Sequence, residues 1–302
     1  MTTTTLSGKV AFVTGGAQGI GRFTATALAE RGARLVLTDI DETALREVAA
    51  EIGEDRVLPV VADVRDLGAM EDAAAQAISR FGSIDYVLAN AGIASYGSIL
   101  QVDPETFRRV VDINLVGVFN TVRATLPSII DSKGYVLIVS SLAAFTPAPG
   151  LAAYNATKAG VEAFGNALRF EVSYQGVDVG TAHMSWIDTP LVQDAKRDLS
   201  AFSKMLRIMP PPLGKTTDVQ ACVDAFVRAL EKRSRRVYVP GWVAAIAHTR
   251  MSASGRLVQK IMERHTPTIL PQMDEEVRRM GRSTSDRNLR NEARADVTAG
   301  SR

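Results

Sequence analysis

Short apolar, β-branched runs alternate with longer segments of helical period along most of the chain. Seven runs are predicted to be strands, at residues 10–14, 34–38, 57–61, 84–89, 135–140, 177–183 and 237–239. The intervals between them have the length and period of helices, and this alternation is typical of a parallel sheet covered on both faces. We therefore expect a doubly wound α/β fold of about seven strands.

The alternation ends near Pro240, and no repeat or linker-like stretch interrupts it before that point. We expect one domain over residues 1–240 and an extension over residues 241–281. Residues 282–302 are rich in Arg, Asn, Ser and Asp and have no apolar period. We expect this last segment to be poorly ordered.

Composition narrows the class of protein. With 46% apolar and 23% charged residues among 302, the chain can bury a full core. Its net charge of +2 creates no global field, which argues against a nucleic-acid binder. The single cysteine, Cys222, is expected to be a small buried hydrophobe in a chain that suits a reducing compartment. The N-terminus lacks the pattern of a signal peptide, so we expect a cytoplasmic protein.

A glycine-rich turn, Thr14-Gly15-Gly16-Ala17-Gln18-Gly19-Ile20-Gly21, joins the first predicted strand to a helix. Gly15 allows a tight exit from the strand, Gly19 lets backbone N–H groups approach a pyrophosphate, and Gly21 lets the helix pack closely on the sheet. An acid, Asp39, follows eighteen residues after Gly21. Together these features indicate a Rossmann-like dinucleotide site.

Asp39 ends the second predicted strand, where its carboxylate could bind the adenosine ribose hydroxyls and repel a 2′-phosphate. With Gln18 rather than a cation before Gly19, this favours NAD over NADP. The alternative is that Asp39 only caps the helix that begins at Asp41. Asp63 either faces an adenine amino group or is a turn residue.

Tyr154 and Lys158 lie four residues apart on one face of a predicted helix. An ammonium beside a phenol, helped by the positive nicotinamide of an oxidised cofactor, lowers the phenol pKa toward the working range, so Tyr154 could exchange a proton with a substrate. Ser141 or its neighbour Ser140 could hold the substrate oxygen, and strand parity does not choose between them. Asn114, in a helical segment, could bend that helix and hold a water near Lys158, or only satisfy backbone groups.

Together these motifs resemble those of the short-chain dehydrogenase/reductase family, in order and spacing, over residues 7–240. The resemblance implies a catalytic tetrad of Asn114, Ser141, Tyr154 and Lys158, and it selects Ser141 over Ser140. It implies a cofactor site formed by Gly15, Gln18, Gly19, Ile20, Gly21, Asp39, Ile40, Asp63, Val64, Asn90, Ala91, Gly92, Tyr154, Lys158, Ile187 and Thr189. It also suggests a homodimer or homotetramer built on the helices from Pro104 and from Tyr154.

One departure from the family is Ser185-Trp186, where the family has Pro-Gly. Trp186 could wall the substrate pocket or shield the cofactor. The segment 191–212 resembles the family's mobile substrate lid.

The sequence favours an NAD-dependent oxidoreductase that interconverts a secondary alcohol and a ketone, with Tyr154 as general acid/base and a bulky hydrophobic substrate. The alternatives are an NADPH-dependent reductase of 3-oxoacyl thioesters and a dinucleotide sensor without turnover. The three histidines are too dispersed to suggest a metal site, and none is predicted.

The extension has three interpretations. It covers the active site of a neighbouring subunit, it lies on an anionic membrane surface, or it is mostly a solvated tail. The first is favoured. The second would use the apolar side chains of Trp242, Val243, Ile246, Leu257, Val258 and Ile261.

Overall fold

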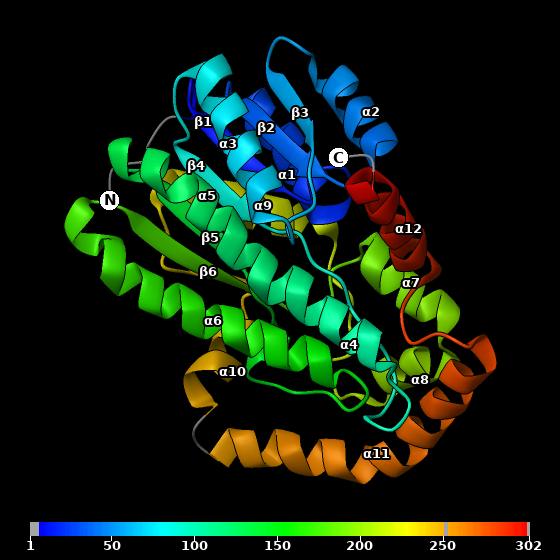
Figure 1. The fold of residues 1–302 in the computed structure, drawn as a ribbon. Coiled ribbons are helices and arrows are strands. Elements are labelled where there is room, and N and C mark those ends of the chain that lie inside the picture. The colour runs from blue at the N-terminus through cyan, green and yellow to red at the C-terminus, as the bar shows by residue number, and fades with distance from the viewer. Residues whose placement is uncertain (1–5, 251–252, 301–302) are drawn as a thin grey trace.

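The computed structural model describes residues 6–250 and 253–300. Within them, seven parallel strands form one sheet in the order β3-β2-β1-β4-β5-β6-β7 (Figure 1). The strands are β1 Val10–Thr14, β2 Arg34–Asp39, β3 Val57–Val61, β4 Tyr86–Ala89, β5 Tyr135–Val139, β6 Asp178–Met184 and β7 Arg236–Val239. All seven predicted strands are confirmed, with ends that differ by one or two residues at most.

Helices cover both faces of the sheet because successive side chains of each strand point to opposite faces. In β1, Ala11 and Val13 belong to one core and Phe12 to the other. The first core includes α1 (Gly19–Glu30), α2 (Glu42–Ile52) and α9 (Val219–Lys232), where Cys222 is fully buried as expected. The second includes α3 (Leu67–Phe81), α5 (Gly117–Asp131) and α6 (Ala152–Val172). The doubly wound fold is therefore confirmed.

Helix α4 (Pro104–Val111) runs into α5 through a π-helical turn, Asp112–Val116. Among the described residues, this continuous helix is the one long and apolar enough to cross a membrane by length and composition, and half of its most apolar window is buried. Val118, Val122 and Ile129 pack into the second core. These buried side chains belong to the core of the fold.

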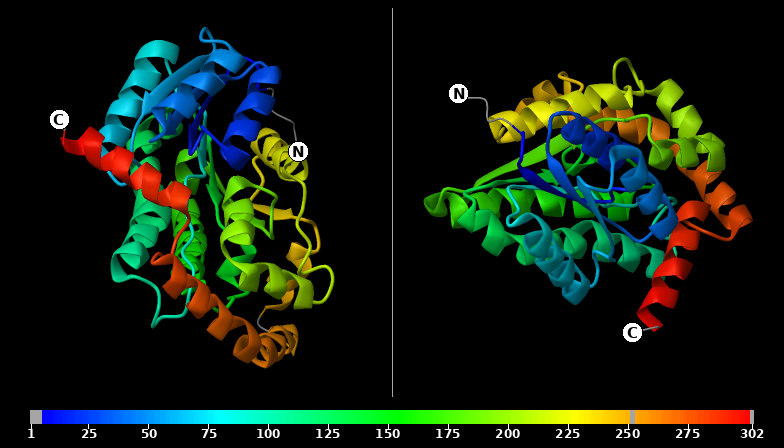
Figure 2. Two further views of the ribbon diagram at one scale, coloured as in Figure 1. Left: turned by 90° about the vertical axis from the view of Figure 1, so that its right-hand side faces the viewer. Right: turned by 90° about the horizontal axis from the view of Figure 1, so that it is seen from above.

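The segment after β7 forms α10 (Val243–Thr249), α11 (Ala253–Met280) and α12 (Asp286–Gly300). In Figure 2, left, α11 and α12 are seen against one side of the molecule, in orange and red. The structure thus differs from the expected disorder after Arg282. The turn between the two helices is the reason, since Ser283, Thr284 and Ser285 are buried and Thr284 Oγ1 donates to Ala94 O at 2.9 Å.

Helix α11 packs on its own subunit, an arrangement that none of the three interpretations of the extension described. Its Ile269, Met273 and Val277 form a third apolar cluster with Phe202 and Met205 of α8 (Ser200–Ile208). This packing contradicts a mostly solvated extension. The membrane interpretation requires exposed apolar side chains in the extension. Of those named for it, Val243 is buried, and the side chains of Leu257 and Val258 lie outside the described residues.

Candidate active site

The strand order reverses between β1 and β4, and in open α/β sheets ligands bind at such a point, beyond the carboxyl ends of the strands. A cleft opens there. Every residue predicted for the site lines this cleft except Gly21 and Asn114, which lie directly behind its wall. The topology therefore brings together residues that span 174 positions of sequence, from Gly15 to Thr189.

The glycine-rich turn is closely packed. A Cβ on Gly21 would lie 2.1 Å from Gly15 O, so only glycine fits there. Gly19 has φ +57°, in the left-handed region that favours glycine. Asn90, at the end of β4, holds the turn by donating from Nδ2 to Thr14 O at 3.0 Å and to Gly15 O at 3.2 Å. The start of α1 is thus fixed with its first N–H groups free of helical partners, which suits a phosphate.

Asp39 lies in the cleft and is not a helix cap. Its Oδ2 accepts from Ala17 N and its Oδ1 from Asp41 N, both at 3.1 Å, while Asp41 caps α2 by accepting from Ala44 N. Burial raises the pKa of Asp39, and these backbone hydrogen bonds oppose the rise. The carboxylate is held in place with capacity for further donors such as ribose hydroxyls.

Asp63 also lines the cleft, but its carboxylate is engaged. Arg65 Nε and Nη2 donate to Asp63 Oδ2 at 2.8 and 2.6 Å, and Arg65 N donates to Oδ1 at 2.9 Å. Ion pairing with Asp63 raises the pKa of Arg65 further. The acid is therefore part of a turn anchored by arginine, and contact with an adenine amino group stays a prediction.

The two serines at the end of β5 face different partners. Ser140 Oγ donates to Lys158 O at 2.8 Å and is fully buried against α6. Ser141 Oγ accepts from Ala143 N at 3.1 Å, donates to Met184 O at 3.4 Å, and lies close enough to the Tyr154 hydroxyl to lower its pKa. Ser141 is therefore the serine placed beside Tyr154, as the family resemblance implies.

Tyr154 and Lys158 lie together on α6, with Lys158 Nζ 5.6 Å from the centre of the Tyr154 ring. Burial raises the pKa of Tyr154, and the hydrogen bond with Ser141 lowers it by less. Burial lowers the pKa of Lys158 to about 8. The expected lowering of the phenol pKa is thus not produced by these residues alone, because burial of the phenol is the largest contribution to its pKa.

Asn114 lies in the π-helical turn that joins α4 to α5. Its Oδ1 accepts from Ile93 N at 2.8 Å, and its Nδ2 donates to Ile93 O at 2.9 Å and to Thr157 Oγ1 at 3.2 Å. The side-chain amide is occupied by these partners. It ties the loop after β4, including Gly92, to the start of α6.

Residues of the loop after β6 line the cleft and also a second, mainly apolar pocket. Ile187 and Thr189 line the cleft, and Thr189 precedes α7 (Pro190–Asp198). Trp186 lines the apolar pocket. Its ring packs edge-on against that of Phe202, with ring centres 5.3 Å apart, and its Nε1 donates to Leu213 O at 3.0 Å. Of its two considered roles, the structure places Trp186 on the wall of the second pocket.

Both pockets are lined by Ser141 and Tyr154, together with Met184 and Ser185. Tyr154 therefore stands where the cleft and the apolar pocket join. In the described part of the chain, no three His, Cys, Asp or Glu side chains are grouped to hold a metal.

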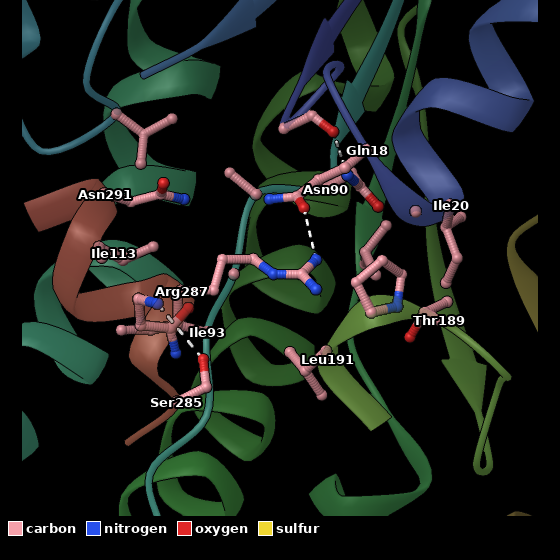
Figure 3. Close-up of a pocket in the computed structure, with 18 of the residues that line it drawn as sticks. Gln18, Ile20, Asn90, Ile93, Ile113, Thr189, Leu191, Ser285, Arg287 and Asn291 are labelled. Atoms are coloured by element: carbon pink, nitrogen blue, oxygen red, sulfur yellow. Dashed lines mark hydrogen bonds between the residues drawn. The ribbon is translucent and has the colours of Figure 1, made fainter. Parts of the chain in front are cut away.

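The outer side of the cleft is formed by residues that the sequence did not indicate. Ser285, Arg287, Asn288, Asn291 and Glu292 of the α11–α12 turn and α12 line it, and Figure 3 shows Arg287 reaching toward Gln18. The one available signal was charge spacing, since Asp286 and Arg290 lie four residues apart and pair in the structure. The absence of an apolar period concealed this helix.

The short chain dehydrogenase family profile matches residues 9–200, which is more than half of the chain. The chain belongs to this family. The probable oxidoreductase EphD of Mycobacterium tuberculosis is 40% identical over 184 residues, which are 60% of this chain and 31% of EphD. The chain thus matches about a third of the length of that relative.

Two solved structures share the fold. A short chain dehydrogenase from Mycobacterium paratuberculosis, bound to NAD, has a TM-score of 0.69 and 27% identity, covering 78% of this chain and 97% of that one. A 3-ketoacyl-(acyl-carrier-protein) reductase from Brucella melitensis, complexed with NADH, has a TM-score of 0.70, 30% identity and the same coverage. Each comparison leaves about a fifth of this short-chain dehydrogenase uncovered.

Proposed function

We propose that the protein is an NAD-dependent oxidoreductase that interconverts a secondary alcohol and a ketone. The observation that carries this proposal is the position of Tyr154 and Ser141 at the junction of the cleft and the apolar pocket. A hydroxyl or carbonyl in the second pocket would there meet a phenol and a serine next to the site for a dinucleotide. Bound NAD would supply the hydride acceptor.

The chain's own residues would bind the reacting oxygen and move its proton. Ser141 Oγ would donate to the substrate oxygen, and Tyr154 would exchange the proton between its phenol and that oxygen. Lys158, whose pKa of about 8 leaves it cationic at neutral pH, would favour the phenolate. The buried phenol needs this support, because burial raises its pKa.

NAD fits the cleft better than NADP. The Asp39 carboxylate is fixed by two backbone N–H groups where the adenosine ribose would lie, and it would repel a 2′-phosphate. The two solved relatives carry NAD and NADH, which supports this preference. The same residue argues against the NADPH-dependent alternative.

The substrate would be bulky and hydrophobic. Most side chains around Trp186 in the second pocket are apolar, including Leu142, Leu151, Phe202 and Met209. A 3-oxoacyl thioester is a second candidate, favoured by the 30% identity to the Brucella reductase. An assay that offers both classes of ketone with NADH distinguishes the two.

Substitution of Tyr154 by Phe tests the function. Turnover should fall by about a thousandfold, the scale of general acid–base catalysis, while NAD binding by calorimetry stays within about twofold. Unchanged turnover in Tyr154→Phe would contradict the assignment. A wild-type protein that binds NAD but turns over neither alcohols nor ketones would instead support the non-catalytic sensor.

We further propose a homodimer or homotetramer through α5 and α6, which lie near each other in Figure 1. Large apolar side chains are exposed on these helices, with Phe119 at 48% and Phe170 at 77% exposure, and Tyr174, just after α6, is 83% exposed. Their burial between subunits would be favourable. The mass from analytical ultracentrifugation, compared between wild type and Phe119→Glu, tests this contact.

A further inference from the structure

Helix α12 lies along the open side of the dinucleotide cleft and is attached to both rims. On the rim of the glycine-rich turn, Arg287 Nη1 donates to Gln18 Oε1 at 2.7 Å. On the opposite rim, Glu292 pairs with Arg65 at 2.9 Å and with Arg109 at 3.1 Å. We propose that Arg287 contacts the pyrophosphate of the bound dinucleotide, so that α12 is the outer wall of the cofactor site. This inference rests on the proposed use of NAD.

The position of Arg287 matches that of a pyrophosphate. Gln18 directly precedes Gly19, the first residue of α1, and the N-terminus of such a helix is where a phosphate binds. Arg287 therefore extends its guanidinium over the turn from the opposite side (Figure 3). A diphosphate between them would receive backbone N–H groups from one side and a planar, permanently charged donor from the other.

The charge balance of the cleft also singles out Arg287. Four cations line the described cleft, and two of them, Arg65 and Arg109, are paired with carboxylates on the far rim. The third, Lys158, lies beside Tyr154 and donates to Val139 O. Arg287 is the remaining one, and the one next to the glycine-rich turn.

Asp194 of α7 is the ion-pair partner of Arg287 and is shared with a second arginine. Its buried carboxylate pairs with Arg287 at 3.1 Å and also with Arg197 at 2.9 Å. Two guanidinium groups thus share one carboxylate, and Arg197 also pairs with Asp198 at 3.1 Å. The pair also fixes the Arg287 side chain in advance, so that little conformational entropy is lost when an anion binds.

This contact lies outside the part of the chain that the family profile matches, which ends at residue 200. A cation delivered from a C-terminal helix of the same chain is thus an addition to the motifs of the first 190 residues. It would compensate for Gln18, an uncharged residue in the turn itself.

Calorimetric titration of the full-length protein with NAD, over a range of salt concentrations, tests the inference. Arg287→Gln should weaken NAD binding about tenfold at low salt, the loss of one hydrogen bond to a charged group, and the difference should shrink as salt rises. Arg287→Lys keeps the charge and should stay within about threefold of wild type. Arg290→Gln is the matched control, because Arg290 is exposed on the same helix and pairs with Asp286.

A second variant separates contact from mere attachment of the helix. Glu292→Gln breaks the attachment at the far rim but leaves Arg287 in place, and it leaves Arg65 and Arg109 less neutralised, so NAD affinity at low salt should not fall and its salt dependence should not weaken. The inference is overturned if Arg287→Gln binds NAD as wild type does, or if Glu292→Gln reproduces both its loss and its altered salt dependence. If wild type itself does not bind NAD, the proposed function fails together with the inference.

Discussion

The cleft has two walls that are built in different ways. The inner wall consists of strand ends and the glycine-rich turn, where backbone atoms approach so closely that a Cβ on Gly21 would lie 2.1 Å from Gly15 O. The outer wall, α12, is attached through side chains such as Arg287 and Glu292. At Gly21 the first wall leaves no room for an added Cβ, whereas single changes in the second remove one contact at a time. Substitutions on the two sides should therefore differ in size and in what they affect.

The largest effect is expected at the inner wall. Gly21→Ala forces Gly15 or α1 to move, because the new Cβ would overlap a backbone oxygen. The first N–H groups of α1 would then no longer converge on a phosphate. We expect NAD affinity to fall by more than about a hundredfold, measured by calorimetry, as two or more such hydrogen bonds are lost.

The matched control is Gly241→Ala, at a glycine where the added Cβ would meet nothing within 4 Å. Its NAD affinity should equal that of wild type. If Gly21→Ala bound NAD equally well, the close approach would have no functional role.

The next effect concerns the support of the outer wall. Met273 of α11 is buried among the lid and extension side chains, and a Cβ on Gly150 would come within 2.4 Å of its sulfur. Met273→Ala leaves a cavity there and should cost about 3 kcal/mol. Because the cluster is separate from the two cores of the sheet, amide exchange should accelerate in α8 and α11 and change little in β1 and β4.

Glu275→Ala is the control for this change, since Glu275 is exposed on the same helix and pairs only with Arg278 in the described contacts. Its exchange rates should match wild type. Equal acceleration throughout the sheet would show that extension and domain unfold as one unit.

The two walls also explain what the sequence could predict. The strands, the turn from Gly15 to Gly21 and the Tyr154–Lys158 pair depend on local patterns, and the structure places them as expected. Strand parity did not decide whether Ser140 or Ser141 faces the substrate. That choice depends on how α6 packs against the end of the strand. Capping of α2, the alternative role considered for Asp39, is performed by Asp41.

The outer wall could not be predicted in this way. Its anchors join residues far apart in sequence, such as Thr284 and Ala94, which are 190 positions apart, and Arg287 and Gln18, which are 269 apart. Polar residues that stabilise a helix through distant partners have the same composition as a disordered tail. The raised pKa of Tyr154 was missed for a related reason, because the depth of burial is a property of the assembled fold.

The buried charge of Lys158 is proposed to serve catalysis, and it should lower the free energy of unfolding. The Lys158 pKa of about 8 lies below the value of 10.5 for an exposed lysine. Below pH 8 the ammonium is charged in both the folded and the unfolded state, but only the folded state buries this charge. This cost is about 3 kcal/mol, and the hydrogen bond to Val139 O returns about 1 kcal/mol. Lys158→Met should therefore be more stable than wild type by about 2 kcal/mol at neutral pH, in denaturant titrations without NAD.

The sign of the pH dependence follows from which state releases its proton first. Between pH 8 and 10.5 the folded wild type loses the Lys158 proton before the unfolded chain does, so its stability rises with pH relative to that of Lys158→Met. The advantage of the variant should shrink across this window. Lys158→Arg keeps the charge and should show no gain, and an advantage independent of pH would assign the effect to packing.

The smallest effect is expected at Trp186, which lines the apolar pocket. Trp186→Phe keeps an aromatic ring against Phe202 but removes the hydrogen bond to Leu213 O, worth about 1 kcal/mol. Since Trp186 lines the apolar pocket and not the cleft, KM for a hydrophobic ketone should rise about fivefold while NAD affinity stays unchanged. Trp242→Phe, at the chain's other tryptophan, should alter neither. Weaker NAD binding with an unchanged KM would instead place Trp186 on the cofactor side, and the division between the pockets would have to be redrawn.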